Sequence, residues 1–421
     1  MYIKQLIEKE AKGCFDFFWN ETNHDESSKG YGLTLDSTRR DDMASIAAVG
    51  FGLSSYVIGV TRGYISFEEG YHRTLKTLES IYQNVDKKNG FYIHFVNYHT
   101  AENYGLKKGR PSEYSTIDTA ILLMGAISAA EFFKKDVKTI VDQMLDEANW
   151  AWLVHPDKPV FRMAYYDDKE RYPQGWNKAT WDHYAEQLMM YFLYAGQDKT
   201  TIEDARKLYF GFHRHVGAYK GDNLVHCYNN ALFIHQFSHA FIDFNQYRDA
   251  KMFNWFKNSV DATIGNYEWC KDQTWSKTFK KGYWGLTAMH SKTGYMVVGG
   301  PPWGFENIDY KPNHMDGTVA PYASLSSMIF TPELSKKQLE LFAQDDKMWG
   351  PYGLYDSFNF EDEKWYSNTY IGIDKGPTLI MLDNYENQTI QKLVTESEFI
   401  QKAIKKLGFR KVEDNIFEKE R

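Results

Sequence analysis

Two acidic side chains lie where helices rich in apolar and aromatic residues are expected to begin. Glu186 stands among tryptophan, tyrosine and methionine residues in segment 181–190, and Asp118 falls in the first turns of a helix expected from residue 115. A carboxyl group buried among rings is disfavoured in its charged form, so its pKa rises and it can act as a general acid. Either residue taken alone is more often a helix cap or a structural hydrogen-bond acceptor.

Taken together, the two acids fit the chemistry of glycoside hydrolysis. One carboxyl group protonates the leaving oxygen, and the other activates water or attacks the anomeric carbon. We therefore predict that Glu186 is the general acid and that Asp118 is the base, nucleophile or proton-relay partner. Glu113, just outside the same helix, is the alternative second carboxylate. Other acids compete for these roles: Asp36, Asp41, Asp42, Asp243, Glu306 and Asp316.

The aromatic content points to a ligand with flat apolar faces. Phe, Trp and Tyr make up 17% of the 421 residues, more than one core requires, and sugars stack their C–H faces on such rings. A large helical core that happens to use aromatic residues is the alternative explanation. The predicted sugar contacts are Trp181, Tyr184, His94, His239, Trp303, Asp316 and Trp365.

Charge and composition exclude several classes of partner. The net charge is −7 and no long basic run occurs, which disfavours binding to nucleic acid or to an anionic membrane surface. No stretch approaches 18 uninterrupted apolar residues. The first residues lack a signal-peptide profile and the three cysteines lie far apart, so we expect a cytoplasmic protein. The sequence does not indicate an oligomeric state.

No cofactor or metal site is expected. His235 and His239 have the i, i+4 spacing of a zinc protease, but Gln236 stands where the general-base Glu would be. Nucleophile-elbow, phosphate-loop and dinucleotide-binding patterns are absent from the sequence. The histidine pair therefore indicates packing or a contact to a sugar hydroxyl.

Apolar periodicity predicts an all-α chain in which helices alternate between two types. Helices beginning near residues 44, 115, 181, 229, 318 and 377 are rich in small, aromatic or polar residues, whereas those near 66, 137, 200, 249, 333 and 388 are conventionally amphipathic. Six inner helices alternating with six outer ones is the pattern of an (α/α)₆ barrel, here a single domain over residues 1–421. A plain helical bundle or a solenoid is the alternative.

Long aromatic loops connect these helices at 21–43, 86–114, 154–180, 265–316 and 345–376. Long loops in a compact domain commonly serve binding or catalysis. Four of the five end where an inner helix begins, so we expect them to collect at one mouth of the barrel. Short β-hairpins are predicted near 90–95 and 295–298. Gly50 lies within a helical run and indicates close helix packing.

Several motifs resemble the glucoamylase-like (glycoamylase) domain family. They are Ser45-Ile46-Ala47-Ala48-Val49-Gly50-Phe51-Gly52-Leu53, Gly59-Val60-Thr61-Arg62-Gly63-Tyr64-Ile65, Ser115-Thr116-Ile117-Asp118-Thr119-Ala120, Leu232-Phe233-Ile234-His235-Gln236-Phe237-Ser238-His239, Tyr283-Trp284-Gly285-Leu286-Thr287-Ala288, Asp316-Gly317-Thr318-Val319-Ala320-Pro321 and Gly372-Ile373-Asp374-Lys375-Gly376-Pro377. The matches occur in order and span about 15 to 395.

That family is similar to the endo-β-1,2-glucanases of glycoside hydrolase family 144 and to the transglycosylase domain of cyclic β-1,2-glucan synthases. The resemblance implies an (α/α)₆ barrel, a β-glucan or β-gluco-oligosaccharide substrate with β-1,2 linkages, and no cofactor. It places Glu186 at the position of the family's acidic residue and Asp118 where the glucanases carry a Glu. The alternatives are a transglycosylase, a polysaccharide lyase on the same barrel and a non-catalytic glycan-binding protein.

Overall fold

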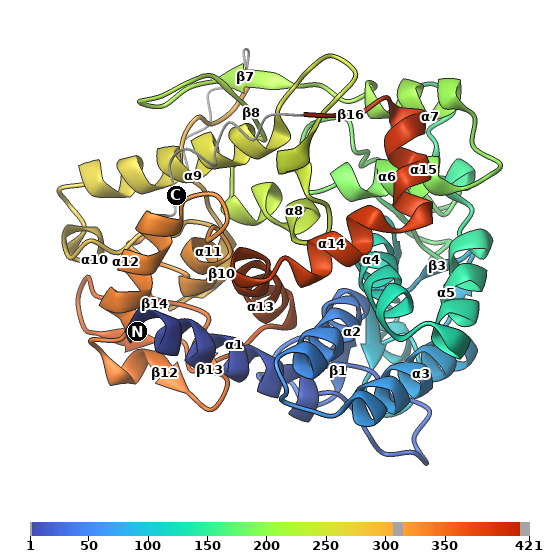
Figure 1. Ribbon diagram of the computed structural model, residues 1–421, viewed down its shortest axis with the longest axis horizontal. Helices are drawn as coiled ribbons and strands as arrows, with labels where there is room; N and C mark the ends of the chain where they lie inside the picture. The colour runs from blue at the N-terminus through green and yellow to red at the C-terminus, as the bar shows by residue number, and fades with distance from the viewer. Residues whose placement is uncertain (1, 306–314, 413–421) are drawn as a thin grey trace.

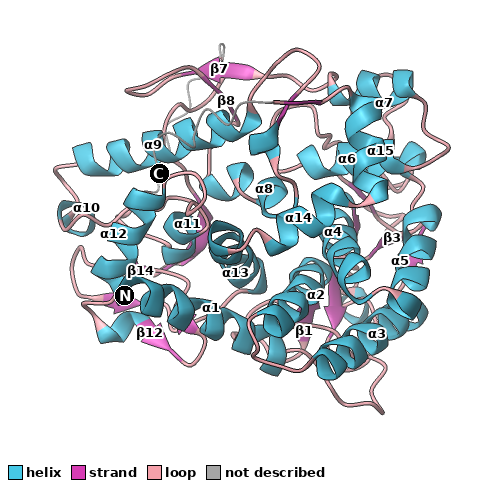
Figure 2. Ribbon diagram, viewed as in Figure 1, coloured by secondary structure: helices cyan, strands magenta, loops and turns pink. Residues whose placement is uncertain are grey.

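The computed structural model describes residues 2–305 and 315–412, and it is mostly helical (Figures 1 and 2). Its helices are α1 Tyr2–Asn20, α2 Ile46–Thr61, α3 Phe67–Asn84, α4 Thr116–Phe133, α5 Lys135–Glu147, α6 Leu188–Gly196, α7 Ile202–Tyr209, α8 Phe237–Phe241, α9 Trp255–Asp272, α10 Lys277–Lys280, α11 Pro321–Leu325, α12 Pro332–Phe342, α13 Gly372–Glu386, α14 Thr389–Glu396 and α15 Glu398–Leu407. Short 3₁₀ turns lie at Leu106–Lys108, Trp150–Leu153, Leu232–His235, Phe244–Gln246 and Asp346–Met348.

The strands form short antiparallel pairs within the loops. The pairs are β1 Met43–Ser45 with β4 Phe95–Asn97, β2 Lys87–Lys88 with β3 Phe91–Tyr92, β5 Tyr114–Ser115 with β6 Ala164–Tyr165, β7 His215–Gly217 with β8 Leu224–His226, β9 Tyr247–Arg248 with β16 Arg410–Lys411, β10 Ala288–Ser291 with β11 Gly294–Val297, β12 Trp349–Gly350 with β13 Gly353–Leu354, and β14 Phe358–Asn359 with β15 Trp365–Tyr366. Both predicted hairpins are confirmed, near 90–95 by β2 and β3 and near 295–298 by β10 and β11.

Helices α2, α4 and α13 are buried along almost their whole length, as expected for inner helices. Glycines let them approach closely. A Cβ atom on Gly125 of α4 would lie 1.8 Å from the carbonyl oxygen of Gly50 on α2, and one on Gly376 of α13 would lie 2.2 Å from the ring of Phe51. The close packing expected at Gly50 is therefore confirmed.

The helices between them are amphipathic and packed on one face. Helix α3 begins with a capping box in which the Ser66 hydroxyl accepts a hydrogen bond from the Glu69 amide and the Glu69 carboxylate accepts one from the Ser66 amide. On α5 the buried side chains are Val137, Val141, Met144 and Leu145, one stripe at helical spacing.

Four inner helices differ in extent from the prediction. The helix predicted to begin near residue 318 is the five-residue α11, Pro321–Leu325. The helix predicted over 181–196 begins only at Leu188, because residues 181–186 run as an irregular segment that pairs with the chain near His213. The helix predicted over 229–245 is a 3₁₀ turn followed by the short α8. Helix α13 begins at Gly372, before the predicted start at Pro377, because that proline is accommodated inside the helix.

Within the described residues, one helix, α4, is long and apolar enough to cross a membrane by length and composition. Most of it (83%) is buried inside the protein, which is typical of a core helix.

The tight contact between α2 and α4 predicts contrasting effects of two substitutions on one helix. Gly50→Ala places a methyl group 2.4 Å from the Ile121 carbonyl oxygen and should lower the free energy of unfolding by about 1–3 kcal/mol. Gly52→Ala, two residues away, meets its neighbours at 3.4 Å and should leave stability unchanged or raise it by up to about 1 kcal/mol. Denaturant unfolding of both variants measures the difference; equal effects would contradict the close crossing.

Candidate active site

Six acidic residues form an electrostatically connected group, here called the acid row: Glu113, Asp118, Glu186, Asp36, Asp374 and Asp356. Helix starts position three of them. Asp118 lies in the first turn of α4, Asp374 lies in the first turn of α13, and Glu186 stands two residues before α6. The positive end of each helix dipole favours negative charge there, which offsets part of the cost of gathering acids.

Glu186 is partly accessible and carries a raised pKa, as the sequence predicts. Burial raises its pKa to about 7, a backbone hydrogen bond opposes that rise, and the negative charge of Asp118 adds to it. The segment is held from α8, since the Ser238 hydroxyl donates to the Glu186 carbonyl oxygen at 2.9 Å. At neutral pH a large fraction of Glu186 therefore holds a proton at an accessible position.

His94 links two members of the acid row. Its Nδ1 lies 2.9 Å from Glu113 Oε1, and its Nε2 lies 3.3 Å from Asp118 Oδ1. The other Asp118 oxygen accepts a hydrogen bond from the Ser115 hydroxyl, the N-cap of α4. Both oxygens of Asp118 are therefore occupied, and its carboxylate is fixed in one orientation.

The charges of this bridge are set by mutual attraction. Burial alone would lower the pKa of His94, but the carboxylates of Asp118, Glu113 and Asp36 raise it to about 9. Burial likewise opposes ionisation of Glu113, yet the hydrogen bond and positive charge of His94 hold the pKa of Glu113 below its usual value. At neutral pH, His94 is therefore an imidazolium that lies between Glu113 and Asp118.

The acid row continues from Asp118 through Asp36 to a buried pair. The backbone of Asp36 accepts a hydrogen bond from Gly372 at 2.9 Å, which places this residue at the start of α13. Burial and the negative charge of Asp118 raise the pKa of Asp36, against the effect of His94. Beyond it lie Asp356 and Asp374, which are 4% and 3% exposed.

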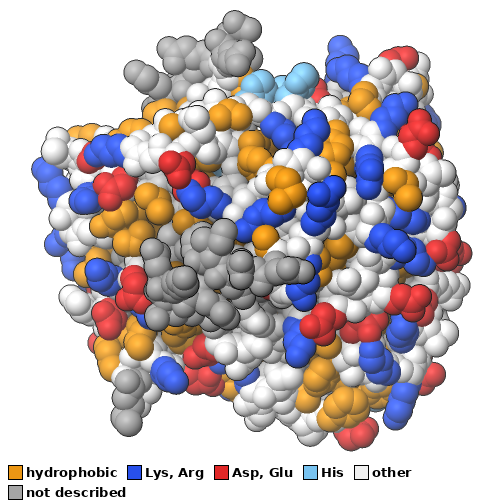
Figure 3. All heavy atoms as spheres, turned by 45° about the horizontal axis from the view of Figure 1, so that its top comes forward, with side chains coloured by type: hydrophobic (Ala, Val, Ile, Leu, Met, Phe, Trp, Pro, Cys, Tyr) orange, Lys and Arg blue, Asp and Glu red, His pale blue; other side chains and the backbone are white. Residues whose placement is uncertain are grey.

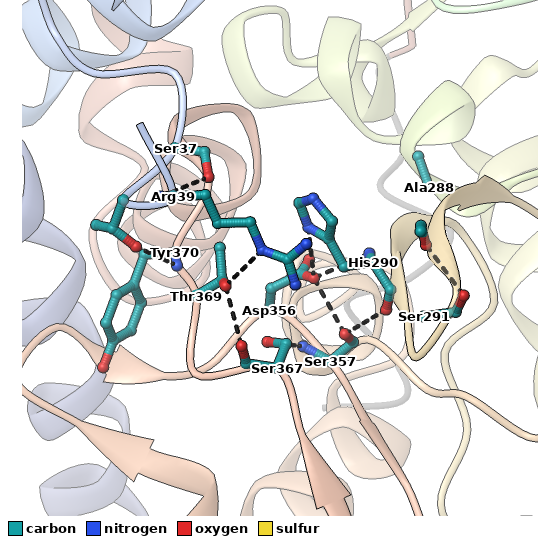
Figure 4. A network of polar contacts seen from close by, with 12 residues as sticks. Ser37, Arg39, Ala288, His290, Ser291, Asp356, Ser357, Ser367, Thr369 and Tyr370 are labelled. Atoms are coloured by element: carbon teal, nitrogen blue, oxygen red, sulfur yellow. Dashed lines mark hydrogen bonds and ion pairs between the residues drawn. The ribbon is translucent and has the colours of Figure 1, made fainter. Parts of the chain in front are cut away.

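Figure 4 shows the surroundings of Asp356. His290 and Ser357 approach its carboxylate, and Arg39 is turned to Thr369, with which its Nε makes a 2.9 Å hydrogen bond. Tyr295, on β11, is 51% exposed and packs its ring on His290 at 5.2 Å. An accessible phenol thus stands beside the buried acids.

Three predicted sugar contacts pack inside the protein. The Trp181 indole donates to Thr116 Oγ1 at 2.9 Å, and Tyr184 stacks on Trp255. His239 bonds Ser259 Oγ at 3.0 Å, and burial lowers its pKa to about 3. All three side chains are buried and hold neighbouring segments in place, so their contact with a sugar stays a prediction.

The remaining predicted contacts lie outside the acid row. Trp303 is partly buried and donates to the Gly299 carbonyl at 2.8 Å, while Asp316 accepts from the Thr318 amide at 2.9 Å in a turn. Trp365 is partly exposed on β15. Among the competing acids, Asp243 caps a 3₁₀ turn, and Glu306 lies outside the described residues.

Sequence reasoning missed two members of the acid row, Asp356 and Asp374. Asp374 lies within a recognised motif, but its place eight residues after the end of β15 and three before a proline hid the start of α13. Asp356 follows an irregular turn, and nothing in its spacing distinguishes it from a loop acid. One sequence signal could have identified Asp374. Like Asp118, it is an acid in the first turn of an inner helix.

Other features do not compete with the acid row. Among residues 2–305 and 315–412, no group of three or more His, Cys, Asp or Glu side chains is arranged to hold a metal ion. A surface hollow of about 750 Å³ lies against α1, lined by residues such as Lys9 and Tyr64, and shares no residue with the acid row. Figure 3 shows acidic and basic side chains interspersed over the face in view.

Comparisons with known proteins agree with this architecture. The glycoamylase family model, described as "Putative glucoamylase", matches residues 178–398. An exo β-1,2-glucooligosaccharide sophorohydrolase (non-reducing end) from Parabacteroides distasonis is 25% identical over 442 residues, covering 97% of this chain and 58% of that protein. The chain thus spans little more than half the length of this curated relative.

Solved structures superpose over nearly the whole chain. A "putative glucoamylase" from Bacteroides uniformis matches with a TM-score of 0.86 at 23% identity, covering 98% of both chains. The endo-β-1,2-glucanase from Chitinophaga pinensis, solved with sophorotriose and glucose, matches with a TM-score of 0.82 at 24% identity, covering 97% of this chain and 99% of that one. These likenesses establish the shared fold.

The imidazolium bridge predicts how His94 titrates. Its ¹⁵N NMR signals should report a pKa near 9, and Glu113→Gln should lower that value because one attracting charge is removed. Glu102→Gln, which alters an exposed acid paired with Lys107, should leave it unchanged. A His94 signal that titrates at the same pH in wild type and Glu113→Gln would contradict the bridge.

The same shift predicts the pH dependence of stability. Because the folded pKa of about 9 exceeds the ordinary value of 6.5, the bridge contributes fully below about pH 6.5 and its contribution is lost as pH rises through about 9. The shift corresponds to roughly 3 kcal/mol. Between pH 6 and pH 9.5, the free energy of unfolding should fall more for wild type than for His94→Gln. Denaturant unfolding at the two pH values measures this difference.

Proposed function

This chain belongs to the glycoamylase family, and from that premise we propose that it is a glycoside hydrolase acting on β-1,2-linked gluco-oligosaccharides. The observation that carries the proposal is Glu186, an accessible carboxyl group that is partly protonated at neutral pH and lies within the electric field of Asp118. The substrate class is supported by the activities named for the Parabacteroides and Chitinophaga relatives.

The proposed reaction begins with proton transfer from Glu186. Its carboxylic acid donates to the glycosidic oxygen as the bond to the anomeric carbon breaks, which avoids expelling an alkoxide. We propose that Asp118 is the second carboxylate. His94 and Ser115 hold its two oxygens, so its carboxyl group enters the reaction in one orientation. Glu113 contacts the far side of His94 and acts through it as a positioning residue.

Asp374 is the other candidate for the second carboxylate. Neither of its side-chain oxygens has a hydrogen-bond partner within the described part of the chain, so either is free to accept a proton. Substitution of each residue by its amide distinguishes the two. The second carboxylate is the one whose loss abolishes turnover while small anions such as azide restore product formation.

We further propose that the helices close into an (α/α)₆ barrel. Inner helices α2, α4, α6, α8, α11 and α13 alternate along the chain with amphipathic helices, and α13 packs against both α2 and α11, which are far apart in sequence. Such closure would bring the starts of α4, α6 and α13 to one mouth. The acid row would then face a substrate from several directions.

Rival functions predict different products. A polysaccharide lyase would yield an unsaturated sugar that absorbs ultraviolet light, a transglycosylase would yield longer or cyclic glucans, and a glycan-binding protein would yield no product. The acid row favours hydrolysis over elimination, because a lyase needs cationic side chains to bind the substrate carboxylate and here His94 is already committed to two acids.

The proposal predicts the outcome of replacing the acid. Glu186→Gln should reduce kcat on β-1,2-gluco-oligosaccharides by roughly 10²–10⁴-fold, which is the usual contribution of general acid catalysis. Circular dichroism should show an unchanged fold. Release of reducing sugar, followed on β-1,2-, β-1,3-, β-1,4- and α-linked substrates, measures the loss.

Glu340→Gln, an exposed residue of α12, is the matched control and should retain wild-type turnover. Full turnover by Glu186→Gln would refute the role of Glu186. Wild-type turnover on another linkage, with none on β-1,2-linked substrates, would refute the substrate class.

A further inference from the structure

Asp356 and Asp374 form a carboxyl pair shielded from solvent. Asp356 follows β13 and Asp374 lies in the first turn of α13. The two carboxyl groups are close enough to interact, since the negative charge of Asp356 raises the pKa of Asp374. Both line an enclosed cavity of about 10 Å³, together with Tyr322, Tyr355 and Tyr370. This volume is close to the minimum that holds one water molecule.

The donors around the pair are unevenly distributed. Asp356 Oδ2 accepts hydrogen bonds from the His290 amide at 3.0 Å and the Ser357 hydroxyl at 3.0 Å, and the ring of His290 lies against the same oxygen (Figure 4). Asp356 Oδ1 and both oxygens of Asp374 have no partner among the described residues. Three buried oxygens therefore lack a donor, and each such orphan costs about 1–3 kcal/mol.

Lys375 lines the same cavity as the pair but makes its hydrogen bonds elsewhere. Lys375, the next residue along α13, donates to Glu10 Oε1 at 2.7 Å and to the Leu354 carbonyl at 2.9 Å. Lys375 is therefore paired with the acid on α1. Its positive charge lowers the pKa of Asp374 less than the other influences raise it. Burial and the charge of Asp356 raise the pKa of Asp374 well above its usual range, and Asp36 adds to the rise.

The remaining titratable groups facing the pair are neutral phenols and one imidazole. Burial raises the pKa values of Tyr295 and Tyr322, and the negative charge of Asp374 raises them further. His290 approaches only the oxygen of Asp356 that already has donors. None of these groups donates a hydrogen bond to the three orphan oxygens.

We propose that Asp356 and Asp374 share a single proton, and that Asp356 is a positioning residue that sets the protonation state of Asp374. A proton between Asp356 Oδ1 and one oxygen of Asp374 satisfies two of the three orphan oxygens. One water molecule in the cavity donates to the third. The pair then carries one negative charge instead of two, which is the arrangement that close buried carboxyl groups adopt.

The catalytic consequence rests on the proposed function. If Asp374 accepts or relays a proton during hydrolysis, its affinity for that proton is controlled by Asp356. Asp356 thereby sets the lower pH limit of the reaction. The shared proton itself requires no substrate and is tested separately.

Infrared spectroscopy of the full-length protein labelled with [4-¹³C]aspartate detects the shared proton. We expect a protonated-aspartate C=O band at pH 7 that shifts in D₂O. Asp374→Asn and Asp356→Asn should each remove this band, because the remaining carboxyl group then ionises against an amide donor. Ser357→Ala, which removes one donor but keeps both carboxyl groups, should retain it.

Two results would overturn the proposal. One is a protonated-aspartate band that persists in both Asn variants, and the other is a wild-type spectrum that lacks this band. Circular dichroism verifies that each variant is folded, and the isosteric Asp374→Asn serves if Asp356→Asn does not fold. The acidic limb of kcat/KM should also move to lower pH in Asp356→Asn. If wild type shows the band but hydrolyses no glucan, the proposed function is refuted and the shared proton is still supported.

Discussion

The structure depends on one electrostatic constraint: acidic groups gathered in a partly buried space cannot all be charged. The acid row meets this constraint in three ways. Glu186 keeps its proton into the neutral range, Glu113 ionises against the imidazolium of His94, and Asp356 and Asp374 are buried with too few donors for two charges. Each solution gives a carboxyl group a different affinity for protons, and separated affinities are what acid–base catalysis requires.

The helices make this crowding possible. Acids at the first turns of α4 and α13 are stabilised by the helix dipoles, and close approach of α2 to both helices through Gly50, Gly125 and Gly376 brings those turns together. The buried ion pair of Lys375 with Glu10 ties α13 to α1 directly behind Asp374. Breaking such a pair leaves an uncompensated buried charge, so it fixes the start of α13 firmly.

Much of the fold could be predicted from the sequence, because buried helices such as α2 and α4 are apolar all round and their partners carry one stripe. Prediction failed where tertiary contacts override local preference. Residues 181–186 have helical composition but pair with the chain near His213, and Pro377, the predicted start of α13, lies inside a helix that begins at Gly372.

The same distinction applies to the site. Glu186, Asp118 and Glu113 were recognisable as acids at helix starts, whereas the bridging position of His94 and the pairing of Asp356 with Asp374 depend on loops that meet only in the folded chain. Burial of Trp181, Tyr184 and His239 likewise could not be read from their types, since aromatic residues serve cores and sugar surfaces equally well.

The most direct test of the account is the pH dependence of kcat/KM on a β-1,2-linked gluco-oligosaccharide. If Glu186 delivers its proton to the leaving oxygen, kcat/KM must fall tenfold per pH unit above a midpoint near 7, where this carboxyl group ionises. An activity that stays constant up to pH 9 would show that no group with the pKa of Glu186 supplies the proton.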